Sequence, residues 1–288
     1  MSEGNSLKKA LLCIRGSSWL RRVGSAMLRL PGVGGVLRRL LLRVLPRGER
    51  IWYQLPSGPA GGLWLKLEPY LEQRYLSGNP EPGVQEAIAR HLSCGDCFYD
   101  AGAHIGYYSL LASRLVGEAG RVVAFEPDPA NLTVLRENLA RNGATNVEVV
   151  PAALWNHSGV VAFERSACRG AAVSSRRGVV VEPAGKELEA GILSVEALTL
   201  DSFAARGNPP GLIKVDVEGA EIEVLEGAEE LIRHSAPVWL FEVHHQAAKV
   251  FLENRLGRYG YELEWLPGYP GYDFPRHVLA RPAAAHKQ

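Results

Sequence analysis

The chain has 288 residues, 47% of them hydrophobic and 22% charged, so it is long enough to bury a core in one large domain or two small ones. Its net charge of +1 hides an asymmetry, because residues 1–50 hold 11 Lys and Arg against Glu3 and Glu49, whereas the remainder holds 21 basic and 29 acidic residues. A net acidic body argues against nucleic acid as a partner, since binding along a phosphate backbone requires a basic face.

The four cysteines are too few and too scattered for a disulfide framework in a chain of this size, which favours a reducing compartment. Cys94 and Cys97 form a CxxC pair. Neither a second ligand pair nor a helix N-terminus after the first cysteine accompanies them, so a zinc or redox role is not indicated. We interpret the pair as two small residues that flank a turn.

Residues 1–50 are rich in Leu and Arg and predict a basic amphipathic helical segment. A basic residue recurs every seven positions, near one helix face, at Lys8, Arg15, Arg22 and Arg29. Arginines interrupt every apolar run before it reaches roughly 18 residues, so the segment is not expected to span a membrane. We favour a cytoplasmic protein that contacts the anionic inner face of the membrane through this segment. A helical cap on the body and a transit peptide remain as alternatives.

From about residue 94 the chain alternates between strand and helix patterns. In chain order we expect a strand at 97–100, a helix at 108–116, a strand at 121–126, a helix at 130–143 and a strand at 147–154. The pattern resumes with a strand and one helix within 212–232 and a further strand within 237–245. Such alternation predicts an α/β fold with a mostly parallel sheet and helices on both faces, in which ligands bind beyond the carboxyl ends of the strands.

A loop of small residues, Gly102-Ala103-His104-Ile105-Gly106, joins the first of these strands, which ends at Asp100, to the first helix. Its glycines would let a ligand approach the backbone closely. Glu126 stands 20 residues past Gly106, at the tip of the second strand, where a carboxylate can accept hydrogen bonds from ribose hydroxyls. The loop lacks the GxGxxG spacing of a dinucleotide site, so the pattern favours a nucleoside ligand without phosphate.

Acidic residues and a histidine gather at the ends of the later strands. Alternation along a strand sends Asp216 and Glu218 in the same direction, and likewise Glu242 and His244. If the two strands are neighbours, the four side chains meet at the mouth that also holds the small-residue loop. Crowded carboxylates are typical of acid/base or metal sites. The competing interpretation is structural, with Glu218 capping the next helix and Glu221 solvated.

Five segments, DAGAHIGYYS, FEPDP, LTLDSF, IKVDVEGAE and FEVHH, occur in an order that resembles the FkbM-type family of S-adenosylmethionine-dependent methyltransferases, over roughly residues 68–282. The resemblance implies a class I, Rossmann-like sheet and O-methylation of a hydroxyl on a sugar, polyketide, related metabolite or glycolipid. It implies a methyltransferase domain at 51–282 and leaves 283–288 as a disordered tail. His104 departs from the family, whose loops more often carry asparagine there.

The resemblance also implies how S-adenosylmethionine is bound. Its methionine moiety is expected beside the first strand and its loop, namely Asp100, Gly102, Ala103, His104 and Gly106. Glu126 is expected on the ribose, and Ala152 and Ala153 near the adenine. The protein then has to hold an acceptor hydroxyl within roughly 3 to 3.5 Å of the methyl group.

A hydroxyl is a poor nucleophile until its proton leaves. We predict His244 as the general base, oriented by Glu242 or Asp216, with Glu218 in the same catalytic set. The acids could instead hold a divalent cation that lowers the pKa of the hydroxyl, although we assign no metal ligands. Two other functions stay open, a nicotinamide-dependent oxidoreductase on a similar sheet and a non-catalytic membrane-associated adaptor. The loop at 166–191 is expected to select the acceptor, a small molecule or a glycan.

Overall fold

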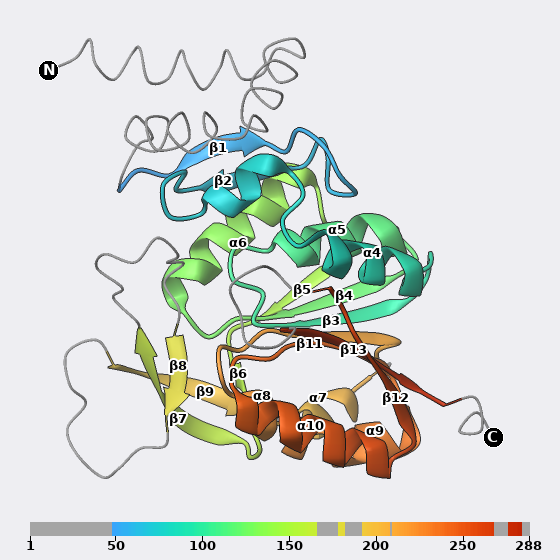
Figure 1. Ribbon diagram of the computed structural model, residues 1–288. Helices are drawn as coiled ribbons and strands as arrows, with labels where there is room; N and C mark the ends of the chain where they lie inside the picture. Colours follow the sequence, from blue (N-terminus) through green and yellow to red (C-terminus); the bar gives the residue numbers. More distant parts are fainter. Residues whose placement is uncertain (1–47, 166–177, 182–191, 208, 268–275, 284–288) are drawn as a thin grey trace, which may run out of the picture. The chain divides into compact units, whose positions relative to one another are not determined.

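The structure, a computed structural model, describes residues 48–165, 178–181, 192–207, 209–267 and 276–283 (Figure 1). The chain divides into two compact units, Met1–Gly78 and Asn79–Gln288. Most of the predicted amphipathic segment, most of the predicted acceptor loop and almost all of the predicted tail lie outside the described residues. The predicted domain boundary after residue 50 therefore stays a prediction.

The described part of the first unit is a small antiparallel hairpin followed by a short helix. Strand β1 (Ile51–Gln54) pairs with β2 (Trp64–Leu67), and the 3-10 helix η1 (Gln73–Ser77) follows. The buried carboxylate of Glu72 accepts hydrogen bonds from the Arg50 guanidinium and from the backbone N–H of Glu68. This pairing ties the residue before β1 to the segment that leads into η1.

The second unit is built on a seven-stranded sheet in the order β12-β13-β11-β10-β3-β4-β5. Its strands are β3 (Cys97–Ala101), β4 (Arg121–Phe125), β5 (Val147–Val150), β10 (Leu212–Val215), β11 (Val238–Glu242), β12 (Tyr261–Trp265) and β13 (His277–Pro282). Strands β5, β4, β3, β10 and β11 are parallel, and β13 and β12 continue the sheet antiparallel. Every residue of β10 is buried, as expected for a strand that is covered on both faces. The predicted mostly parallel α/β sheet is confirmed.

Helices cover both faces of this sheet (Figure 1). On one face lie α4 (Pro82–His91), α5 (Tyr107–Val116) and α6 (Pro129–Asn142), and on the other α7 (Leu200–Ala204), α8 (Glu221–Glu226), α9 (Glu229–His234) and α10 (Gln246–Arg258). Helix α6 has clear end signals, because the Asp128 side chain accepts the Ala130 N–H and Gly143 closes the helix in the left-handed conformation. Among the described residues, no helix is long and apolar enough to cross a membrane.

A hydrophobic core fills the space between the sheet and the α7–α10 layer. The rings of Tyr99, Phe125 and Phe203 meet edge to face, and Trp239 stacks on Phe241 with ring centroids 5.4 Å apart. These side chains belong to β3, β4, β11 and α7. The core therefore holds in place the strands from whose carboxyl ends the site residues extend.

The predicted strand at 147–154 is wrong in one respect, because two strands in different sheets occupy it. Strand β5 ends at Val150, and β6 (Ala153–Leu154) joins a second sheet in the order β6-β9-β7-β8. The other strands of that sheet are β7 (Gly159–Arg165), β8 (Gly178–Val181) and β9 (Ile192–Leu198). Pro151 has no N–H to donate to a strand ladder, so β5 stops before it.

The single helix expected within 212–232 is two short helices, α8 and α9, which are separated at Gly227 and Ala228. A Cβ added at Gly227 would lie 2.3 Å from the carbonyl oxygen of Trp155. The backbone at Gly227 therefore packs against another segment too closely for any side chain. This contact is long-range, so helical periodicity could not reveal the break.

Candidate active site

The glycines of the loop between β3 and α5 hold it against neighbouring elements. Gly102 and Gly106 have φ angles of 83° and 86°, in the left-handed region that favours glycine. A Cβ added at Gly102 would lie 2.0 Å from the carbonyl oxygen of Asp216, and one added at Gly106 would lie 2.4 Å from Cδ1 of Leu135. These glycines thus allow the loop to lie close to other parts of the protein. The sequence had predicted that they allow a ligand to approach the backbone. Contact of this loop with a cofactor stays a prediction.

Asp100, in β3, carries a buried carboxylate with one unsatisfied oxygen. The residue is 1% exposed, and its Oδ2 accepts a hydrogen bond of 2.6 Å from Ser109 Oγ. Its Oδ1 is buried and has no hydrogen-bond partner among the residues that the structure describes. Burial raises the pKa of Asp100 above its ordinary value, against the opposing charge of Lys214. Because an unsatisfied buried acceptor is costly, Asp100 suits a ligand group that donates hydrogen bonds.

Glu126 follows β4, at the position that the sequence predicted, and ties the small-residue loop to the start of α6. Its Oε2 accepts the His104 N–H at 2.8 Å, and its Oε1 accepts the Asp128 N–H at 2.8 Å and Nδ2 of Asn131 at 3.3 Å. Burial raises the pKa of Glu126 to about 7, although these hydrogen bonds lower it. The carboxylate is therefore near its titration midpoint at neutral pH.

Three other predicted cofactor contacts are buried, whereas His104 is half-buried. Ala103 lies in the loop after β3, Ala152 lies between β5 and β6, and Ala153 begins β6. His104 has a φ of 52°, which is uncommon for a residue other than glycine. The placement of these residues around methionine and adenine stays a prediction.

The structure brings together the four predicted catalytic residues beyond β10 and β11, which are parallel neighbours. Asp216 and Glu218 follow β10, Glu242 is the last residue of β11, and His244 lies two residues further on. The Nε2 atom of His244 lies 3.0 Å from Glu218 Oε2, 3.6 Å from Glu242 Oε1 and 3.9 Å from Asp216 Oδ1. Glu218 is thus closer to Nε2 than the two residues that were predicted to orient the ring.

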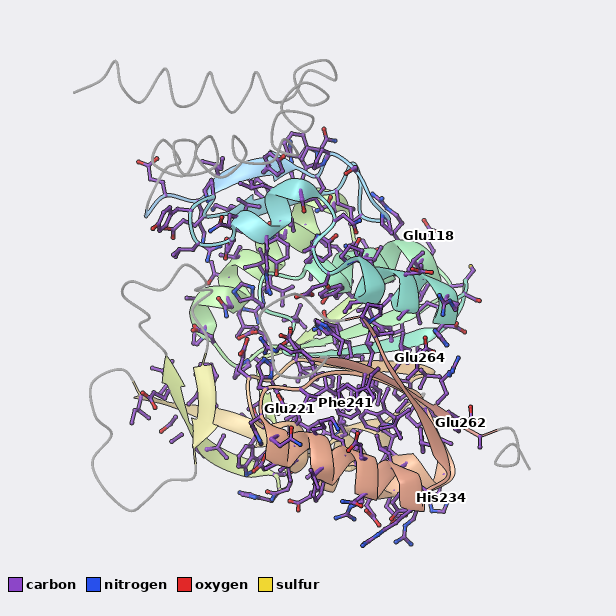
Figure 2. All side chains as sticks on the ribbon, viewed as in Figure 1. Glu118, Glu221, His234, Phe241, Glu262 and Glu264 are labelled. Carbon is purple, nitrogen blue, oxygen red and sulfur yellow. The ribbon has the colours of Figure 1, made fainter. Side chains whose placement is uncertain are left out.

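Sequence analysis missed the residue that holds the other ring nitrogen of His244. Oε1 of Glu221 lies 2.6 Å from His244 Nδ1 and also accepts the backbone N–H of Gly219 at 2.9 Å. The expectation that Glu221 is solvated was wrong, since it is 0% exposed at the first turn of α8 (Figure 2). Val224 and Leu225, three and four residues later, are buried on the same helix face, and that spacing was the available signal.

The surrounding carboxylates keep a proton on His244. Burial lowers the pKa of the imidazole, but the hydrogen bonds with Glu218 and Glu221 and the charge of Asp216 outweigh this effect and raise it to about 10. Lys214 is also buried, and its Nζ lies 3.1 Å from Asp216 Oδ2. The imidazolium and this ammonium group together offset part of the negative charge of the cluster.

Among the residues that the structure describes, two sets of side chains have donor atoms that are spaced for a metal ion, each set within 4.8 Å. They are Asp216, Glu218 and His244, and Glu81, Glu242 and His277. Sequence analysis singled out neither Glu81, which immediately precedes α4, nor His277, which begins β13.

Comparison with known proteins places the site within a family domain. Residues 100–263, more than half of the chain, match the Methyltransferase FkbM domain. The chain belongs to the FkbM methyltransferase family. The match includes Asp100, Glu126 and the cluster around His244. The crystal structure of the FkbM methyltransferase from Methylobacillus flagellatus is similar to the present structure, at 14% identity and a TM-score of 0.48. The alignment covers 78% of the present chain and 62% of the Methylobacillus chain.

Two named methyltransferases are similar to this FkbM-family chain in sequence. Methyltransferase sdnD of Sordaria araneosa is 34% identical over 155 residues, which are 46% of this chain and 60% of sdnD. Hexuronic acid methyltransferase AglP of Haloferax volcanii is 29% identical over 168 residues, which are 57% of this chain and 62% of AglP. The matched region therefore spans less than two thirds of the length of either relative.

Proposed function

We propose that the chain is an S-adenosylmethionine-dependent methyltransferase that methylates a hydroxyl group of a sugar, polyketide, related metabolite or glycolipid. The observation that carries the proposal is that Asp100 with its unsatisfied Oδ1, in β3, and the cluster around His244, beyond β10 and β11, share one edge of the sheet. Family membership supports methyl transfer. The name of one relative, hexuronic acid methyltransferase, supports a sugar hydroxyl as the acceptor.

The residues at this edge fit S-adenosylmethionine. Oδ1 of Asp100 is a buried acceptor without a donor, as the methionine ammonium group requires. The Glu126 carboxylate offers about four acceptor sites, and three protein donors occupy three of them, which leaves one for a ribose hydroxyl. A second ribose hydroxyl would displace the longest of the three bonds, which is 3.3 Å to Asn131. Ala152 and Ala153 are assigned to the adenine. Bound S-adenosylmethionine supplies an electrophilic methyl group, and the protein supplies alignment and a proton acceptor.

The cluster around His244 is suited to removing the acceptor's proton. Methylation of a hydroxyl releases a proton, and a base within hydrogen-bond reach lowers the barrier. We assign this step to His244 and Glu218 as a pair: the Glu218 carboxylate, 3.0 Å from Nε2, takes the proton, because the ring with its raised pKa already carries one. Glu221 orients the ring through Nδ1, and the charges of Asp216 and Glu242 stabilise the imidazolium.

Ligand binding tests this function. Calorimetric titration of the full chain should show saturable binding of S-adenosylmethionine and no binding of NADH, the cofactor of the oxidoreductase alternative. Transfer of tritiated methyl groups to a glycan that contains hexuronic acid then tests the acceptor class. Binding of NADH without binding of S-adenosylmethionine would overturn the proposal.

Affinity for S-adenosylmethionine should depend on pH through Glu126. Ribose hydroxyls donate best to the ionised carboxylate, whereas burial holds the pKa of Glu126 at about 7 in the free protein. Below pH 7 the carboxyl group of Glu126 must therefore lose a proton when the ligand binds. The affinity should decrease as the pH is lowered and be about tenfold weaker at pH 6 than at pH 8. Calorimetry at both pH values measures this difference. Glu126→Gln has no titrating carboxyl and should show a flat profile; an equal slope in both proteins would assign the dependence to another group.

We also propose that residues 1–50 contact an anionic membrane at its cytoplasmic face, on the strength of their 11 Lys and Arg against two acidic residues. Deletion of residues 1–47 leaves Arg50 and its bond to Glu72 intact. This deletion should abolish co-sedimentation with phosphatidylglycerol vesicles and preserve affinity for S-adenosylmethionine. Phosphatidylcholine vesicles are the neutral control. Aggregation of the shortened chain, or loss of cofactor binding, would instead identify the segment as a structural cap.

A further inference from the structure

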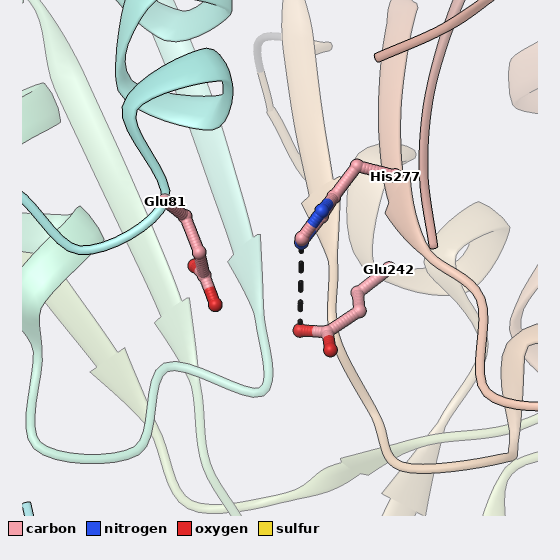
Figure 3. Close-up of side chains that lie close together, drawn as sticks. All are labelled: Glu81, Glu242 and His277. Atoms are coloured by element: carbon pink, nitrogen blue, oxygen red, sulfur yellow. Dashed lines mark ion pairs between the residues drawn. The ribbon is translucent and has the colours of Figure 1, made fainter. Parts of the chain in front are cut away.

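Glu81, Glu242 and His277 converge from three separate parts of the second unit (Figure 3). Glu81 precedes α4, Glu242 ends β11, and His277 begins β13. The antiparallel pairing of β11 with β13 sets Glu242 directly opposite His277. The three side chains point toward one another, and one donor atom of each lies within 4.8 Å of the other two.

The imidazole of His277 lacks a hydrogen-bond partner at Nε2, the atom that faces the two carboxylates. Its side chain is 8% exposed, and this nitrogen forms no hydrogen bond with any residue that the structure describes. The distance from Nε2 to Glu242 Oε2 is 3.7 Å, which is close enough for an ion pair (dashed line in Figure 3) but too long for a hydrogen bond. A buried ring nitrogen without a hydrogen-bond partner lowers the stability of the folded protein. A metal ion between the imidazole and the carboxylates would give this ring nitrogen a partner.

Neighbouring side chains also act on these carboxylates, and the charge of the buried Lys214 ammonium is felt by both Glu81 and Glu242. Nη2 of Arg276 contacts Oε1 of Glu242 at 2.9 Å, which is the oxygen that faces away from His277 in the pairing. Lys214 directs its Nζ to Asp216 Oδ2. The Tyr108 hydroxyl donates a hydrogen bond to Oε2 of Glu81. Hydrogen bonds of this kind commonly orient carboxylates that ligate a metal.

We propose that Glu81, Glu242 and His277 bind a divalent transition-metal ion such as Mn²⁺ or Zn²⁺. One imidazole with two carboxylates suits these ions better than the all-oxygen sets that Mg²⁺ and Ca²⁺ prefer. Bonds of about 2.1 Å place neighbouring donors about 3.0 to 3.4 Å apart, so the 3.7 Å between Glu242 and His277 needs only a small movement.

Two of the three proposed ligands have no part in the proposed methyl transfer. Glu81 and His277 lie outside residues 100–263, which match the family domain, so the match does not supply two of the three ligands. Glu242 connects the two sites, because its Oε1 lies 3.6 Å from His244 Nε2. The ion would thus lie one carboxylate away from the proton-accepting pair.

Binding of Mn²⁺ to the full chain tests the proposal without any methyl donor. After dialysis against EDTA and removal of the chelator, MnCl₂ is titrated and free Mn²⁺ is followed by electron paramagnetic resonance. We expect one saturable site per chain, with nitrogen-14 modulation in the electron spin echo from the coordinated imidazole. No saturable binding, or binding without nitrogen modulation, would overturn the proposal.

Substitutions locate the ion. His277→Ala should weaken Mn²⁺ binding at least tenfold and remove the nitrogen modulation, whereas His244→Ala should retain both. The matched control is His234→Ala, because that imidazole is 74% exposed on α9. The reverse result, with modulation lost in His244→Ala and kept in His277→Ala, would assign the ion to the set around His244 and refute the proposal.

A second variant covers the case in which His277→Ala fails to fold, as judged by circular dichroism and thermal melting. Glu81 is only partly buried, and its side chain makes no capping hydrogen bond to α4, so Glu81→Gln should fold normally. It removes a charged ligand and should weaken Mn²⁺ binding at least tenfold. Unchanged affinity in the folded Glu81→Gln variant would refute the site.

Discussion

Replacement of His244 by alanine is expected to lower kcat for methyl transfer by about 10²–10⁴, the usual contribution of a general base. The substitution removes the imidazolium that links Glu218 at Nε2 to Glu221 at Nδ1, so the carboxylate that takes the proton loses the group that positions it. Affinity for S-adenosylmethionine should change little, because Asp100 and Glu126 belong to β3 and the end of β4. Release of tritiated methyl groups into product measures kcat, and calorimetry measures the affinity.

His234→Ala is the matched control for this experiment. His234 lies at the outer edge of the helix layer (Figure 2), where it pairs with the exposed Glu230, and its loss should leave kcat unchanged. Glu218→Gln tests the assignment of a pair. If His244 and Glu218 act as one unit, the double variant should be little slower than the slower single variant. Full activity of His244→Ala would remove it from the reaction and transfer the role to Glu218 or Asp216.

Replacement of Glu126 by alanine should weaken the binding of S-adenosylmethionine at least tenfold. Hydrogen bonds to a charged acceptor contribute about 1.5–3 kcal/mol each, and one such bond already corresponds to more than a tenfold change. The substitution also leaves the N–H groups of His104 and Asp128 without their acceptor, which loosens the loop after β3. Calorimetry at pH 8, where the carboxylate is ionised, measures the loss.

Two further variants separate ribose binding from loop structure. Glu126→Gln keeps the size of the side chain and an acceptor oxygen but removes the charge, and we expect it to bind more weakly than wild type while melting at a similar temperature. Glu118→Ala changes an exposed glutamate on the same unit (Figure 2) and should behave as wild type. A wild-type dissociation constant for Glu126→Ala would show that another residue holds the ribose.

Local signals in the sequence were sufficient to predict the sheet and the edge that carries the site. The β-branched runs of β4 and β5 and the end of α6 at Gly143 depend only on residues close together in the chain. Parallel neighbouring strands end at the same edge of the sheet, so Asp100 and Glu126 could be assigned to one binding site at that edge. The same reasoning brought Asp216 and His244 together before any distance was known.

Contacts between distant segments were beyond this reasoning. The split at Gly227 depends on the Trp155 carbonyl, and the path of β6 depends on its pairing with β9. Glu221 had the spacing of a buried helix face, but its charge argued for solvent. It is buried because His244, from another strand, supplies a partner for its carboxylate.

By itself the sequence determined the α/β alternation, the residues at the carboxyl ends of the strands and the family resemblance, because each depends on order and spacing along the chain. Only the tertiary structure decided that carboxylates raise the pKa of His244 to about 10 and that Glu81 and His277 meet Glu242. The reason is physical. Coulomb and hydrogen-bond energies depend on separations of a few ångströms between side chains, and here packing and strand register set those separations between residues far apart in the chain.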